Sequence, residues 1–255
     1  MMRLPFALLL PASVALAGPM AAPAPPQTEY VQLLDAQLPL SGAFNNDDGS
    51  PVRLGAFFGR KPVVLVLGYY HCPNLCSTLM DGVLEGLADV RLPPRAYRVV
   101  GVSIDPSENA DIAARKKASY EPLVERAGGD LHLLTGMQPQ IDALAQSAGF
   151  HYAYDASLRQ YVHPAGFLIA TPEGRISHYF MGVRFDPRDL RLALVDASSG
   201  RIGSPVDRLL LLCSHYDPAT GRYSTEAMNV VRAACIAVLA ALGAWMWRAR
   251  RRRAA

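Results

Sequence analysis

The chain has 255 residues, 51% of them hydrophobic and 18% charged, with a formal net charge of +3. Five arginines within residues 248–253 exceed this positive excess, so the rest of the chain is near neutral or acidic. This distribution argues against a nucleic-acid-binding protein. The length allows one or two domains, but both ends have the composition of export or membrane segments, so we expect one domain between them.

The N-terminal residues 1–17 have the features of a secretory signal peptide. A single Arg3 precedes an apolar run, and the Ala-Leu-Ala triplet at 15–17 suits signal-peptidase cleavage. Without cleavage, the same run would remain as an N-terminal membrane anchor. Residues 18–37 begin with a Pro- and Ala-rich stretch and are predicted to form a loose spacer and entry segment.

Near the other end, residues 230–247 are predicted to form a transmembrane helix. The uncharged part, 233–247, would reach only about 22 Å as a helix against a hydrocarbon core of about 30 Å. Residues 230–232 must therefore extend it, with Arg232 snorkelling toward the interface. The basic segment 248–255 predicts a cytoplasmic C-terminus, which places the globular domain on the periplasmic side of the inner membrane.

Between these ends, residues 38–200 are predicted to form one α/β domain. Residues 61–70 are a β-branched and aliphatic run, which predicts a strand buried on both faces. A helix is predicted to follow from Ser77, because apolar residues then recur at helical spacing. They are Leu79, Met80, Val83, Leu84 and Leu87.

The strand and helix alternation continues through the middle of the domain. Residues 96–104 predict a second strand, and Asp105-Pro106-Ser107 closes it and can cap a helix at about 109–127. The pattern then predicts a strand at 131–134, a helix at 138–148 and a further strand at 150–154.

An antiparallel hairpin is predicted in the last part of the domain. Its strands, 166–170 and 176–181, are joined by the turn sequence Thr-Pro-Glu-Gly-Arg, and a closing helix follows at 187–199. Parallel crossovers followed by such a hairpin predict an α/β fold with a mixed central sheet and helices on both faces.

Cys72 and Cys76 stand where the first strand gives way to the helix, in the stretch GYYHCPNLC. Two side chains four apart on a helix share one face, about 6 Å apart at the Cα atoms, close enough for a disulfide or for one metal ion. The unpaired amides of a first helical turn favour ionised thiols. Spacing alone leaves a redox pair, a metal site and a structural disulfide open. His71 points away from the cysteine face if strand alternation persists, which favours a structural or tuning role over ligation.

The stretch GYYHCPNLC between strand and helix resembles the signature of the Sco/SenC family of thioredoxin-like copper proteins. His163, in YVHPAGFLIATPEG and 87 residues after Cys76, matches the distal histidine of that family. The sequence VSIDP also fits, with Asp105 as the acidic residue near the site. The resemblance extends over about residues 38–198 and implies a thioredoxin-like fold.

Copper, as Cu(I) or Cu(II), is the metal that this resemblance implies, with Cys72, Cys76 and His163 as its ligands. Two thiolates suit the soft Cu(I) ion, and an added imidazole allows Cu(II) as well. Three ligands leave the ion transferable, whereas a structural zinc site would need a fourth ligand that the sequence lacks at the usual spacing. The family likeness implies a metallochaperone, rather than an enzyme, that serves the dinuclear copper centre of cytochrome c oxidase subunit II.

Two other functions use the same cysteines. A thiol-disulfide oxidoreductase would use Cys72 and Cys76 as a redox pair to reduce the cysteines of an acceptor copper site, without His163. A redox or copper sensor would have the same ligands and a different partner. The two cysteines and the histidine therefore leave the partner open.

The predicted tail, 201–229, contains a second candidate site. Cys213 and His215 form a Cys-x-His pair that could take part in copper or redox chemistry; the alternative is a cysteine packed in an apolar strand. Disulfides persist in an exported protein, so each of the three cysteines of the exported part would be paired, metal-bound or protected. Cys235 falls in the predicted transmembrane helix.

Overall fold

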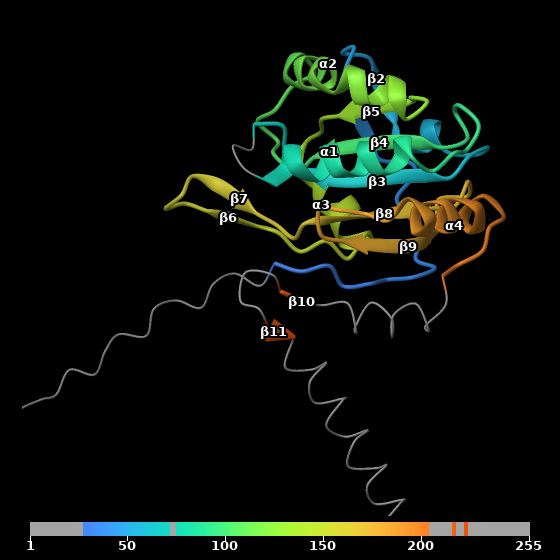
Figure 1. Ribbon diagram of the computed structural model, residues 1–255. Helices are drawn as coiled ribbons and strands as arrows, with labels where there is room; N and C mark the ends of the chain where they lie inside the picture. Colours follow the sequence, from blue (N-terminus) through green and yellow to red (C-terminus); the bar gives the residue numbers. More distant parts are fainter. Residues whose placement is uncertain (1–27, 72–74, 204–215, 218–221, 224–255) are drawn as a thin grey trace, which may run out of the picture.

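The computed structural model describes residues 28–71, 75–203, 216–217 and 222–223, with the backbone alone at 75–77, 216–217 and 222–223. Its centre is a mixed sheet of five strands in the order β5-β4-β3-β8-β9 (Figure 1). The three strands β3 (Val63–Gly68), β4 (Arg98–Ser103) and β5 (Leu131–Leu134) are parallel, and β8 (Gly166–Ala170) and β9 (Ile176–Met181) form the antiparallel hairpin.

In the part of the chain that the structure describes, four helices accompany the sheet, and short elements surround it. The helices are α1 (Leu75–Ala88), α2 (Ala110–Arg126), α3 (Gln138–Ser147) and α4 (Pro187–Ser198). The short elements are the 3-10 helix η1 (Leu54–Phe57) and the strand pairs β1 (Ala43–Asn45) with β2 (Pro51–Arg53), β6 (Ala153–Asp155) with β7 (Gln160–Val162), and β10 (Tyr216–Asp217) with β11 (Arg222–Tyr223).

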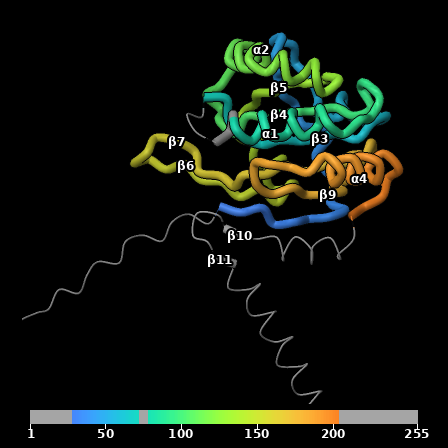
Figure 2. Tube along the Cα trace, viewed as in Figure 1, coloured from blue at the N-terminus to red at the C-terminus, as the bar shows by residue number. Residues whose placement is uncertain are grey.

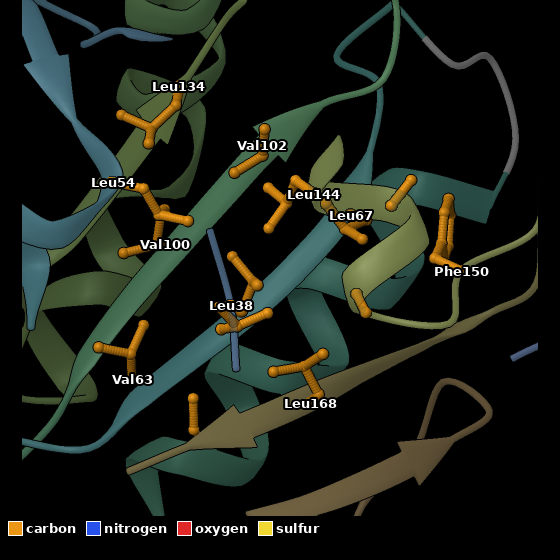
Figure 3. Close-up of a cluster of buried hydrophobic side chains, with 14 of the residues drawn as sticks. Leu38, Leu54, Val63, Leu67, Val100, Val102, Leu134, Leu144, Phe150 and Leu168 are labelled. Atoms are coloured by element: carbon orange, nitrogen blue, oxygen red, sulfur yellow. The ribbon is translucent and has the colours of Figure 1, made fainter. Parts of the chain in front are cut away.

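Two hydrophobic clusters lie on opposite faces of the sheet, because successive side chains of a strand point to opposite sides. Val64 and Val66 of β3 pack into the cluster that contains residues of α1, α2 and α4. Val63, Leu65 and Leu67 pack into the other, with α3 and the N-terminal segment 30–58. Figure 3 shows part of this second cluster, with Leu38 and Leu168 among its members, and Figure 2 shows the course of the chain around both.

The predicted α/β fold is confirmed, with a mixed central sheet and helices on both faces. The strand predicted at 61–70 is β3, the helix that follows the cysteines is α1, and the hairpin at 166–181 is β8 and β9. All five apolar positions that predicted α1 are buried: Leu79, Met80, Val83, Leu84 and Leu87.

Two local predictions were wrong. The cap of α2 is Asn109, whose side chain accepts a hydrogen bond from the Ile112 N–H; the residues at 105–107 instead close a turn of their own. The strand predicted at 150–154 begins only at Ala153 and pairs with β7 outside the main sheet. Phe150 is instead buried in the core and bridges to Tyr30, so its apolar character reflected core packing.

Gly82 lets α1 lie directly against the chain that precedes α4. A Cβ atom at Gly82 would stand 2.0 Å from the carbonyl oxygen of Val183. Glycine in a helix interior costs about 1 kcal/mol relative to alanine, so close packing is the reason for its presence here. The contact fixes the position of α1, whose first turn carries Cys76.

The predicted signal peptide, 1–17, and transmembrane helix, 230–247, lie outside the described residues. Within the part of the chain that the structure describes, none of the helices combines the length and the apolar character needed to cross a membrane. The tail predicted at 201–229 is described only at 201–203, 216–217 and 222–223.

Candidate metal centre

The cysteine motif lies at the carboxyl end of β3. Cys76 is the second residue of α1, so its backbone belongs to the first turn of the helix. Cys72 lies outside the described residues, and the side chain of Cys76 is also not described. The amides of a first helical turn have no partner within the helix and carry a partial positive charge, which stabilises an anionic group placed there.

His163 lies in the segment between β7 and β8 and packs against two aromatic rings. Its ring centroid is 5.9 Å from that of Tyr69 and 5.8 Å from that of Phe150. Tyr69 is buried and stands only three residues before Cys72. The fold therefore brings His163, which is distant in sequence, next to the segment that carries the first cysteine.

The surroundings of His163 favour a neutral imidazole. Burial lowers the pKa of His163, and a hydrogen bond with the backbone carbonyl of Pro164 opposes this effect without cancelling it. Nδ1 lies 3.0 Å from that carbonyl oxygen. Because the carbonyl can only accept, Nδ1 carries the proton in the neutral ring and Nε2 holds the lone pair. A neutral imidazole is the form that binds metal ions.

The buried carboxylate of Glu108 was missed by the sequence prediction. It lies immediately before α2, only 1% of its side chain is exposed, and it accepts hydrogen bonds from the backbone N–H groups of Tyr70 and His71. A glutamate next to a helix N-terminus is usually solvated, so no local pattern distinguishes it. Its contacts join the loop after β4 to the loop after β3, since parallel strands place their carboxyl ends at one edge of the sheet.

The structure gives Asp105 and His71 different surroundings. The Asp105 carboxylate accepts from the N–H and O–H groups of Ser107 and so closes a local turn. Burial and then the negative charge of Asp105 raise the pKa of Tyr161, whose ring centroid lies 5.7 Å from that of Tyr69. The side chain of His71 is 62% exposed, and its Nδ1 lies 3.1 Å from Glu108.

Other predicted ligands fall outside the described residues, namely Cys213 and His215. Among the side chains that the structure does describe, no three from His, Cys, Asp and Glu gather as a metal site. The predicted ligand set includes two cysteine side chains that are not among them, so its geometry stays a prediction. The donor set itself, two thiolates and a neutral imidazole, fits copper.

The fold and the strand-to-helix cysteine motif define the class: a thioredoxin-like α/β protein. The family model SCO1/SenC matches residues 37–195, which is more than half of the chain and includes Cys72, Cys76 and His163. The chain therefore belongs to the SCO1/SenC family. No curated protein sequence matched it significantly.

Solved structures with the same fold support this placement at the level of architecture. A protein of Aquifex aeolicus VF5 is 19% identical, with a TM-score of 0.58 over 65% of this chain and 95% of that one. A SCO1/SenC family lipoprotein of Bacillus anthracis is 18% identical, with a TM-score of 0.53 over 65% and 95%. ScoI of Arabidopsis thaliana, whose crystal structure has copper bound, is 19% identical, with a TM-score of 0.52 over 62% and 96%.

Proposed function

We propose that this protein binds copper through Cys72, Cys76 and His163 and delivers it to the dinuclear copper centre of cytochrome c oxidase subunit II. The observation that carries the proposal is the packing of His163 on Tyr69, three residues before Cys72, in a chain of the SCO1/SenC family. The copper bound to ScoI of Arabidopsis thaliana supports the choice of metal.

The ligand types explain how such a protein can both hold and release copper. Thiolates bind Cu(I) tightly, and the neutral His163 adds a ligand that Cu(II) accepts well. Three protein ligands do not enclose the ion, so a thiolate or imidazole of an acceptor can bind before the donor ligands leave. Copper is the cargo of this exchange, and no covalent bond of the protein needs to change.

A membrane anchor would assist the transfer. The predicted helix at 230–247 would hold the domain on the periplasmic side, close to an acceptor that is itself in the membrane. Tethering raises the effective concentration of donor and acceptor, commonly to the millimolar range for short flexible linkers, without any new contact.

A second function, thiol-disulfide exchange with the acceptor cysteines, is favoured by one observation. Cys76 lies in the first turn of α1, and a helix N-terminus stabilises the reactive thiolate. In that reaction, the thiolate of Cys72 or Cys76 would attack the acceptor disulfide. The second thiolate would then resolve the mixed disulfide, leaving the acceptor reduced and the pair oxidised. His163 has no role in this chemistry.

Copper loading of the full-length chain tests the proposal. The protein would be purified in mild detergent under reducing conditions, loaded with Cu(I), oxidised in air and analysed for bound copper and for thiolate-to-Cu(II) absorbance. We expect about one copper per chain in the wild type and none in the Cys72→Ser, Cys76→Ser double variant. Equal copper in both proteins would refute the assignment of the site.

A further inference from the structure

A buried carboxylate with four hydrogen-bonding contacts lies beside the cysteine loop, and the ligand set does not account for it. Oε1 of Glu108 accepts the backbone N–H of His71 at 2.7 Å and lies 3.1 Å from the ring Nδ1 of the same residue. Oε2 accepts the backbone N–H of Tyr70 at 2.9 Å and the hydroxyl of Ser103 at 2.5 Å.

Burial of this carboxylate has a cost that its contacts must offset. Transfer of a charged group out of water is strongly unfavourable unless hydrogen bonds replace the lost hydration. Glu108 is 5% exposed as a residue, and Ser103 is fully buried. Hydrogen bonds to charged groups are stronger than those between neutral groups, so the four contacts together hold the carboxylate in one place.

Local helix capping does not explain the position of Glu108. Asn109, the next residue, already caps α2 by accepting from Ile112, and the Glu108 side chain turns instead toward residues 37 and 38 positions earlier in the chain. Two of its partners are backbone amides, those of Tyr70 and His71. A carboxylate that binds backbone amides fixes the path of the chain itself, whatever side chains that chain carries.

We propose that Glu108 is a positioning residue that fixes the approach of Cys72 to the copper site by holding the backbone of Tyr70 and His71. The inference rests on the proposed function. Cys72 follows His71 directly, and consecutive Cα atoms are about 3.8 Å apart, so the anchored amide limits where the first thiolate can lie. Ligands held in this way bind metal more tightly, because less conformational entropy is lost on binding.

The charge of Glu108 has a second consequence at the same site. A nearby negative charge stabilises the more positive copper ion, so the wild-type site favours Cu(II) over Cu(I) more than a site without that charge would. Removal of the charge raises the copper midpoint potential. The potential therefore reports the charge of Glu108, whereas amide exchange at residues 70 and 71 reports how well the backbone is held.

The test compares Glu108→Gln with Asp130→Asn in the full-length chain. Gln has the same shape, but its NH2 group cannot accept a hydrogen bond, so one of the two backbone amides loses its partner while Ser103 can rotate to accept. Asp130 lies before β5, at the opposite end of the parallel strands, and bonds Arg98 and His132. Both variants replace a hydrogen-bonded carboxylate by an amide, and only one lies at the cysteine loop.

Three measurements are made on each protein: Cu(II) affinity by competition with a chelator, the copper midpoint potential, and hydrogen exchange of the peptide containing residues 70 and 71. In Glu108→Gln, we expect an affinity loss of about 10- to 100-fold, the range typical of groups that orient metal ligands. We also expect a higher potential and faster amide exchange. All three should be unchanged in Asp130→Asn.

The other possible results also decide whether Glu108 is a positioning residue. Affinity within about twofold of wild type, with an unchanged potential, would show that Glu108 serves only the fold. Equal losses in both variants would show the same. If Glu108→Gln fails to fold, Ser103→Ala removes one of the four contacts and should lower affinity by about two- to tenfold, the value of a single hydrogen bond; no loss there overturns the proposal.

A failure of the proposed copper-binding function would give a different result from a failure of the positioning role. A wild-type protein that binds no copper would refute the copper assignment, and with it the positioning role toward copper. Amide exchange at residues 70 and 71 would still report whether Glu108 orders the loop. The two failures are therefore distinguishable in one set of samples.

Discussion

The two ends of the parallel strands each contain a carboxylate that joins neighbouring segments, but the partners differ. At the carboxyl end, Glu108 binds the backbone amides of Tyr70 and His71. At the amino end, Asp130 binds side chains, with Arg98 Nε at 2.8 Å and His132 Nε2 at 2.9 Å. The first arrangement fixes a loop, and the second links two strands that the sheet already holds together.

This difference is consistent with the copper site that we propose at the carboxyl end of the strands. A sheet edge that only has to be stable can use side chains that reach one another across strands. A loop that must present thiolates needs its backbone held, because a side-chain contact leaves the backbone free to move. The same two ends also each contain a histidine near an aromatic ring, His163 on Tyr69 and His132 on Phe57. These paired features allow matched experiments.

The largest expected effect comes from His163→Ala, with His132→Ala as its counterpart at the other end. Loss of a ligand should lower Cu(II) affinity more than about 100-fold, above the range typical of groups that only orient ligands. His132→Ala should leave affinity within about twofold. Chelator competition and the thiolate-to-Cu(II) absorbance measure both.

The same pair of variants distinguishes the two candidate functions. A copper-binding wild type whose His163→Ala form keeps its Cu(II) affinity would favour thiol-disulfide exchange, since that reaction does not need the imidazole. Reduction of an acceptor-site disulfide by each variant, followed by thiol counting, provides the second readout.

Gly82→Ala should produce the next largest effect, on stability. A Cβ atom 2.0 Å from the Val183 carbonyl oxygen forces a backbone shift, and overpacking of this kind costs about 1 to 3 kcal/mol. Gly86→Ala is the control, because its new Cβ would meet the movable end of the Leu190 side chain at 2.7 Å. Urea unfolding should show a smaller loss for Gly86→Ala, and equal losses would contradict the assigned contact.

Two tyrosine hydroxyls, one at each end, should have smaller effects on stability. Tyr70 donates to the Leu134 carbonyl at 2.7 Å, and Tyr97 donates to the Ala127 carbonyl at 2.6 Å. Each Tyr→Phe variant should lose about 1 kcal/mol of unfolding free energy. Tyr70→Phe should keep wild-type copper affinity, because Glu108 holds the backbone of Tyr70 rather than its hydroxyl; a large affinity loss would assign the role to the side chain instead.

The smallest effects concern how the stability of the fold depends on pH. His163, at the carboxyl end of the strands, and Asp130, at their amino end, act in different pH ranges. Burial lowers the pKa of His163 below 6.5, so the unfolded state binds more protons and stability falls as pH decreases below about 6.5. Burial alone would raise the pKa of Asp130, but hydrogen bonds from Arg98 and His132 lower it below 3.8, so its contribution is lost only at more acidic pH.

Urea midpoints measured from pH 8 to pH 3 check both ranges. His163→Gln should flatten the curve between about pH 6.5 and the lower pKa of the folded state, and Asp130→Asn should flatten it only below about pH 4. A His163→Gln curve parallel to that of the wild type would show that the imidazole is not buried in its neutral form.

Much of the fold was predictable because its signals are local. The valines of β3 and the helical spacing of the apolar residues in α1 predict which side chains are buried. The Pro-Glu-Gly sequence between β8 and β9 predicts a turn. Strand β7 was missed and β6 was predicted to begin too early, because the two strands have only three residues each and are half exposed, which leaves little apolar periodicity to detect.

The candidate site was predictable only in part. Cys72, Cys76 and His163 could be named because the residues around them resemble a family signature. Glu108 has no such signal, since its partners, Tyr70 and His71, lie 38 and 37 residues away. Asp105, which the motif suggested, closes a local turn with Ser107, and its role near the copper site stays a prediction.

The sequence by itself determined which segments become buried strands and helices and where the thiols stand among them, because burial and helix starts depend on neighbouring residues. Only the tertiary structure showed that Glu108 holds the backbone before Cys72 and that the ring of His163 packs on Tyr69. Parallel strands bring distant loops to one edge of the sheet, and the side chains that meet there are chosen by strand order and register, which local periodicity does not encode.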